Sequence, residues 1–174
     1  MTHRMFRLTT ILALSLMVMG LFISPKPAMA QVTAFKQAVA EAAARDKDIA
    51  AFYQANGYKS IWTGRAGRDR TRRQALIKAL SRASAHGLPA ARYDVGGLQA
   101  KMKATRGPRE RGAMEVEMSR VFLQYARDLQ TGVLIPNHVD KAIVRQVPYR
   151  DRTSYLVSFS KSSPVGFFKA LAQG

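Results

Sequence analysis

The stretch AMEVEMSRVFLQYARDLQTG, residues 113–132, decides the fold, because it is the longest periodic run of the sequence outside the N-terminus. Its large apolar side chains recur at helical spacing and define one face: Met114, Met118, Val121, Phe122, Tyr125 and Leu129. The charged and amide side chains are expected off that face: Glu115, Glu117, Arg120, Gln124, Arg127 and Asp128. Gly132 follows, where a left-handed C-terminal cap favours glycine. We expect a core helix with other helices around it and no reactive group in it.

Shorter helices are expected before and after this stretch. Apolar periodicity and capping residues place them near residues 32–44, 48–55, 76–85, 95–103, 151–160 and 164–171. Asp46 or Asp48, Asp94 and Asp151 are expected helix caps, because a carboxylate accepts the free N–H groups of a first turn. Residues 58–62 are expected to be extended, and residues 143–148 to be extended or a short strand. The sequence therefore predicts one mainly α domain of about seven short helices, with little or no sheet.

The first thirty residues have the pattern of a secretory signal peptide. Arg4 and Arg7 make a basic start, residues 8–23 are almost uncharged and apolar, and residues 28–30 read Ala-Met-Ala, a small-x-small cleavage site. An uncleaved membrane anchor is the alternative, but the apolar run is shorter than the roughly 20 residues that a spanning helix needs. We expect cleavage after Ala30, export to the periplasm, and a mature domain of residues 31–174.

The mature part of the chain is strongly basic and has no cysteine. The sequence has a formal charge of +17, and residues 1–30 hold three basic residues and no acid, so residues 31–174 carry +14. Such a charge attracts nucleic acid, anionic lipid or an acidic wall polymer, and export favours the envelope targets over nucleic acid. Without cysteine there is no disulfide, no thiol nucleophile and no thiolate metal ligand.

The densest basic cluster is the run of residues 65–73. It contains five arginines: Arg65, Arg68, Arg70, Arg72 and Arg73. Forked guanidinium groups bind wall carboxylates or lipid headgroups well. The alternative is a solvated loop and first helical turn, as charge runs usually are. Arginine in a first helical turn is disfavoured by the helix dipole, which lends some support to an external partner.

Other candidate groups favour structural roles. His86 at a helix end and His138 in a loop have no second histidine at metal spacing, so no metal or cofactor is expected. Glu115 and Glu117 point to different sides of a helix and do not form an acid–base dyad. Trp62, with two neighbouring tyrosines, is either a sugar-stacking platform or, as we expect, a residue folded back into the core.

Three strings, in order and spacing, resemble one family. FYQANGYKSIW (residues 52–62) resembles its opening "FY…Y.P.W" motif, and HGLP (86–89) followed by RYD (92–94) resembles its "GL.P..Y" segment. FLQYARDLQTG (122–132), followed by Pro136, resembles its "YA.DL..G…P" signature. The sequence is similar to the N-terminal scaffold region of the large periplasmic murein L,D-transpeptidases of the alphaproteobacterial type.

The resemblance implies a supporting role in peptidoglycan crosslinking and cell-wall biogenesis. In that family a cysteine thiolate of a later catalytic domain carries the acyl group, and a peptidoglycan-binding domain usually accompanies it. Neither domain is recognisable here, so no catalytic residue is carried over and the chain is not expected to catalyse alone. The expected partners are a catalytic transpeptidase domain and peptidoglycan. The alternative function is a stand-alone basic module that binds anionic wall material through residues 65–73.

Overall fold

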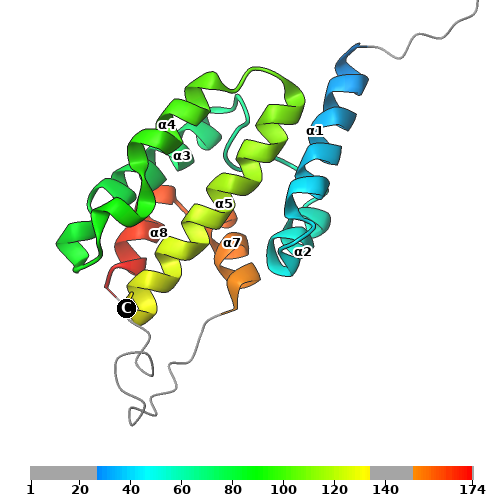
Figure 1. The fold of residues 1–174 in the computed structure, drawn as a ribbon. Coiled ribbons are helices and arrows are strands. Elements are labelled where there is room, and N and C mark those ends of the chain that lie inside the picture. Colours follow the sequence, from blue (N-terminus) through cyan, green and yellow to red (C-terminus); the bar gives the residue numbers. More distant parts are fainter. Residues whose placement is uncertain (1–26, 134–150, 174) are drawn as a thin grey trace, which may run out of the picture.

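The computed structural model describes residues 27–133 and 151–173, and this part of the chain is helical without any strand (Figure 1). The α-helices are α1 (Pro27–Ala43), α2 (Lys47–Ala55), α3 (Gly67–Ser81), α4 (Val95–Ala104), α5 (Pro108–Thr131), α7 (Arg152–Lys161) and α8 (Pro164–Leu171). Two short 3-10 helices, η1 (Ala83–His86) and η2 (Ala90–Tyr93), connect α3 to α4. The predicted small, mainly α fold of about seven helices is confirmed.

Helix α5 is the element around which the others pack. It runs through the middle of the molecule, with α1 lying along it and α2, α7 and α8 also in contact with it (Figure 1). The predicted apolar stripe is in the core: Met114, Met118, Phe122 and Tyr125 are buried, while Val121 and Leu129 are half-buried against the core. The helix begins five residues earlier than the periodicity indicated, because Pro108 occupies its first turn, where its missing N–H costs nothing.

The predicted caps hold the short helices at their N-termini. The side chain of Asp46 accepts the backbone N–H of Ile49 at 3.2 Å at the start of α2. Asp94 and Asp151 accept the N–H groups three residues after them, at 3.0 and 2.7 Å, at the starts of α4 and α7. Each carboxylate satisfies one donor of a first turn that lacks an intrahelical acceptor.

An aromatic cluster forms the centre of the core. The ring of Trp62, fully buried, stacks on Phe159 of α7 with centroids 4.9 Å apart. Phe122 of α5 lies 4.8 Å from Phe159 and 5.9 Å from Phe168 of α8, again between ring centroids. The expectation that Trp62 folds back into the core, rather than forming a sugar-stacking platform, is therefore confirmed.

Several expectations fall wholly or partly outside the described residues. Residues 1–26 of the expected signal peptide, the expected extended segment 143–148 and His138 lie there. Residues 27–30 form the first turn of α1, which therefore begins upstream of the predicted residue 32. In the described ranges, none of the helices combines the length and the apolar character that crossing a membrane requires.

Candidate functional site

Glu115 of α5 is the centre of a buried hydrogen-bond network. Its Oε1 accepts the backbone N–H groups of Ile61 (2.6 Å) and Trp62 (3.0 Å) and the hydroxyl of Tyr53 (2.9 Å). Its Oε2 accepts the N–H and the hydroxyl of Thr63, both at 2.7 Å. The residue has no exposed surface. One carboxylate therefore satisfies the donors of the irregular segment between α2 and α3, which has no ladder or helix to pair with.

Burial governs the ionisation of this network. It raises the pKa of the Glu115 carboxyl above its ordinary value, although the N–H groups of residues 61–63 act in the opposite direction. Burial and the adjacent Glu115 carboxyl raise the pKa of Tyr53 well above its ordinary value, so its hydroxyl stays protonated. Ser119, one turn after Glu115, completes the network: it accepts the Trp62 indole N–H at 2.9 Å and lies 2.8 Å from the Tyr53 hydroxyl oxygen.

The sequence reasoning was wrong about the position of Glu115. It placed this residue off the apolar face, but the carboxyl lies in the core. The buried face of α5 is wider than the predicted stripe and includes four residues at helical spacing: Glu115, Ser119, Phe122 and Ala126. The prediction that Glu115 and Glu117 point to different sides is confirmed, because Glu117 pairs with Lys101 of α4 at 2.5 Å. A carboxylate with no exposed surface and five donors around it anchors the fold and does not meet a substrate.

The second polar cluster is an ion pair inside the arginine run. Arg72 and Asp69, one turn apart on α3, are both buried and pair at 3.1 Å. Arg72 also donates to the carbonyl of Ser160, and Arg68 donates to the same oxygen at 3.0 Å. Ser160 lies in the last turn of α7, whose carbonyls carry the negative end of that helix dipole. The first turns of α3 thus meet a compensating charge within the protein.

The structure separates the five predicted arginines into two groups. Arg68, Arg72 and Arg73 donate to backbone carbonyls, the last to those of Trp62 and Gly64. Arg65 and Arg70 are exposed. Burial and the neighbouring Arg68 lower the pKa of Arg72. Anion binding by this run stays a prediction. Within the described residues, Arg65 and Arg70 are the two arginines of the run that donate to no backbone carbonyl.

A third cluster ties the 3-10 helix η2 to the end of α5. Asp128 is buried and accepts Arg92 Nε at 2.7 Å and the Tyr93 hydroxyl at 2.9 Å. The ring of Tyr93 packs edge-on against Tyr125, with centroids 5.5 Å apart. Asp128 thus anchors η2 to the last turns of α5. Like Glu115, this carboxyl lies off the predicted apolar face and is nevertheless buried.

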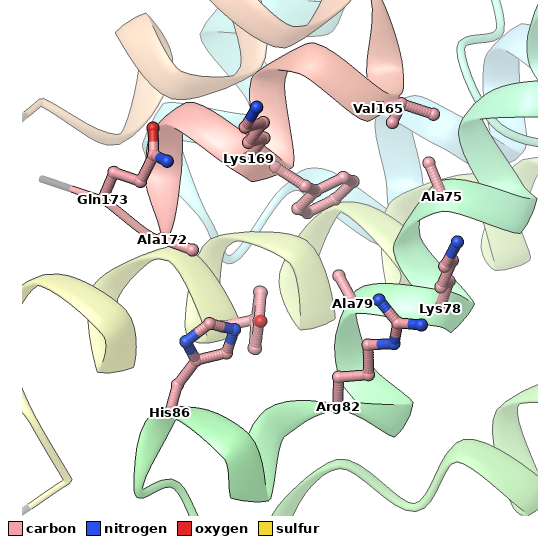
Figure 2. A pocket seen from close by; sticks show the side chains of 11 residues that line it. Ala75, Lys78, Ala79, Arg82, His86, Val165, Lys169, Ala172 and Gln173 are labelled. Atoms are coloured by element: carbon pink, nitrogen blue, oxygen red, sulfur yellow. The ribbon is translucent and has the colours of Figure 1, made fainter.

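A pocket of about 390 Å³ opens between α3, η1, α5 and α8 (Figure 2). Apolar and aromatic side chains form much of its wall: Ala75, Ala79, Tyr125, Val165, Phe168 and Ala172. Its polar lining consists of Lys78, Arg82, His86, Lys169 and Gln173. In Figure 2, Lys78 and Arg82 project from one wall, Lys169 lies on the opposite helix with Gln173 just beyond its end, and His86 lies at one end of the pocket. Sequence reasoning had assigned only His86 among these, and as a helix-end residue.

Groups of three or more metal-ligating side chains are not found among the described residues. His86 is exposed and lines the pocket just described. The three buried carboxyls of the described residues, those of Asp69, Glu115 and Asp128, are engaged in structural contacts.

Comparison with known proteins identifies one family. A family model described as "Scaffold domain" matches residues 47–173, which runs from α2 to the end of α8 and leaves α1 outside the match. Neither a curated protein nor a solved structure matches the chain.

Proposed function

We propose, from the premise that this chain belongs to the Scaffold domain family, that it is the scaffold region of a murein L,D-transpeptidase. In this role it supports peptidoglycan crosslinking and cell-wall biogenesis without performing the acyl transfer. The family match supports the assignment as a scaffold domain. The resemblance of three sequence strings to the transpeptidase scaffold motifs supports the assignment to a murein L,D-transpeptidase.

The observation that carries this function is what the motif residues do in the fold. From the first string, the Tyr53 hydroxyl donates a hydrogen bond to Glu115 of α5, and the Trp62 indole N–H donates one to Ser119 of the same helix. Tyr93, from the second string, bonds to Asp128 of the third. These motif residues therefore join distant segments to one helix, which is what a supporting domain requires.

The chemistry would have to come from a partner domain. The sequence has no cysteine, so it cannot provide the thiolate that takes the acyl group from a peptide stem in this family. The proposed partners are a catalytic transpeptidase domain and peptidoglycan, and the proposed location is the periplasm. The signal-like residues 1–30 support that location.

A domain exchange tests the proposal. The scaffold region of an active L,D-transpeptidase of this type is replaced by residues 31–174, and crosslink formation is measured from tetrapeptide stems. We expect the exchanged enzyme to form crosslinks well above the level of the same enzyme with its scaffold deleted, while the isolated chain forms none.

Two variants test whether the gain in crosslinking depends on the buried network around Glu115. Glu115→Ala in the exchanged enzyme should abolish the gain, because it removes the acceptor of five donors, whereas Glu117→Ala, on the surface of the same helix, should keep it. An exchanged enzyme that is folded by circular dichroism but no more active than the deletion would refute the scaffold role. Turnover by the isolated chain would refute its assignment as non-catalytic.

The alternative function, binding of anionic wall material, has a separate test. Retention of the chain on purified sacculi at low and moderate salt is compared with that of an Arg65→Ala, Arg70→Ala double variant. Exposed charges are screened by salt, so specific retention should fall with salt and with the double variant. Retention that is insensitive to both would remove this alternative.

A further inference from the structure

The pocket between α3, η1, α5 and α8 is lined by apolar and basic side chains. Four of its eleven lining residues are basic, and none of the eleven is acidic. Within the described ranges, no ion pair is formed by these four basic residues, Lys78, Arg82, His86 and Lys169. Arg92 and Arg152, elsewhere in the domain, do have carboxylate partners. Four basic side chains thus line a pocket that has no acidic residue in its wall.

The wall of the pocket adds a hydrogen-bond donor. Tyr125 is 2% exposed and lines the pocket, and in the described part of the chain its hydroxyl makes no hydrogen bond. Burial raises the pKa of this hydroxyl, so it remains a donor. The hydroxyl oxygen is not one of the buried polar atoms that lack a partner, so it has accessible surface and an acceptor in the pocket can reach it.

The floor of the pocket suits an apolar group. Phe168 of α8 and Ala75 and Ala79 of α3 are among its apolar lining residues. The volume of about 390 Å³ falls in the range of small-molecule sites, which are mostly apolar with a few placed polar groups. A long polyanion has no apolar part for such a floor, whereas a small amphiphile has both parts.

We propose that this pocket binds a small amphiphilic anion, a molecule with a short alkyl or aryl body and one carboxylate or phosphate. The apolar body lies on Phe168 and the alanines of α3. The anionic group meets Lys78, Arg82 and Lys169 and accepts the Tyr125 hydroxyl. This site is distinct from the anchoring network of Glu115, and the proposal does not depend on the scaffold role.

Three probes of one length test the proposal: octanoate, octyl phosphate and octanol. Binding to the full chain is measured by isothermal titration calorimetry at low and moderate salt. At least one anion should bind about tenfold more tightly than octanol, because one charge-assisted hydrogen bond contributes about that factor to an affinity. Its affinity should fall as salt rises, because salt screens exposed charges. The stronger of the two anions identifies the headgroup. Equal affinity for octanol and both anions would overturn the proposal, as would no binding by any probe.

Three variants test whether the anion binds in this pocket. Arg82→Ala should weaken anion binding about tenfold, and Ala79→Phe, which fills the floor, should abolish it. Lys161→Ala is the matched control, because Lys161 is an exposed cation that does not line the pocket. Circular dichroism verifies that each variant is folded. If Lys161→Ala weakens binding as much as Arg82→Ala, or if folded Ala79→Phe binds normally, the anion is not in this pocket.

Discussion

The carboxylate of Glu115 accepts the backbone N–H of Ile61 at 2.6 Å, although 54 positions separate the two residues in the sequence. Through this contact and its neighbours, α5 holds a segment that has no regular secondary structure of its own. The stability of the domain therefore depends on one side chain to a degree that few surface positions approach.

The first prediction concerns that dependence. Glu115→Ala should lower the free energy of unfolding by about 3 kcal/mol or more, because it leaves several buried donors without an acceptor. Urea denaturation followed by circular dichroism measures the change. Glu117→Ala, which removes an exposed pair with Lys101, should cost less than about 1 kcal/mol. Similar losses for both variants would contradict the anchoring role.

The second prediction concerns pH. The folded-state pKa of Glu115 is raised above its unfolded value of about 4.5, so the folded state binds the proton more tightly. Its contribution to stability is therefore fully present below pH 4.5 and is lost as pH rises through the folded pKa. We expect the unfolding free energy of the native chain, relative to Glu115→Gln, to fall as pH increases above about 4.5. A relative stability that rises over that range would mean that the N–H donors outweigh burial.

The third prediction compares two partners of Asp128. Tyr93→Phe removes a buried hydrogen bond and should cost about 1–1.5 kcal/mol. Arg92→Ala should cost less, about 0–1 kcal/mol, because the Arg92 side chain is 41% exposed and its pair is screened by solvent. Thermal unfolding at neutral pH ranks the two. The reverse order would show that the ion pair, and not the tyrosine hydroxyl, holds η2 to α5.

The fourth prediction concerns the docking of α1, which lies outside the family match. A Cβ at Gly112 of α5 would come within 2.7 Å of both the Ala38 Cβ and the Phe35 carbonyl oxygen. Gly112→Ala should therefore push α1 away from α5 and speed proteolytic cleavage within residues 27–43, several-fold at least. Gly96→Ala, at a position with no neighbour within 4 Å, is the control and should leave cleavage unchanged.

Local patterns in the sequence were sufficient for the existence of the α-helices and for three of their N-terminal caps, but not for every end, since α3 begins at Gly67 and not near residue 76. The caps at Asp46, Asp94 and Asp151 follow from short-range chemistry, and the stripe of α5 follows from periodicity. The burial of Glu115 could not be read in this way, because its donors lie 52 to 62 positions earlier in the chain. Periodicity assigns a charged residue to the surface unless the distant groups that satisfy it are known.

The arginine run shows the same limit for a site. The helix dipole correctly marks arginine at the start of α3 as unfavourable without a partner. Arg72 has a local partner in Asp69, but its other partner is the Ser160 carbonyl, 88 positions later, which no local pattern reveals. The basic pocket was missed for a related reason: its residues come from four elements, and none of them forms a motif within its own segment.

The stacking of Trp62 on Phe159 has a consequence for how the chain folds during synthesis. The two rings belong to segments 97 positions apart, and α7 with Phe159 emerges from the ribosome after α1 to α5. Until then one face of the indole has no cover, so the earlier helices cannot close the core. Contacts of such long sequence separation form late and slow the final step. A nascent chain arrested before α7 should therefore remain sensitive to protease, and release of the following residues should make it resistant.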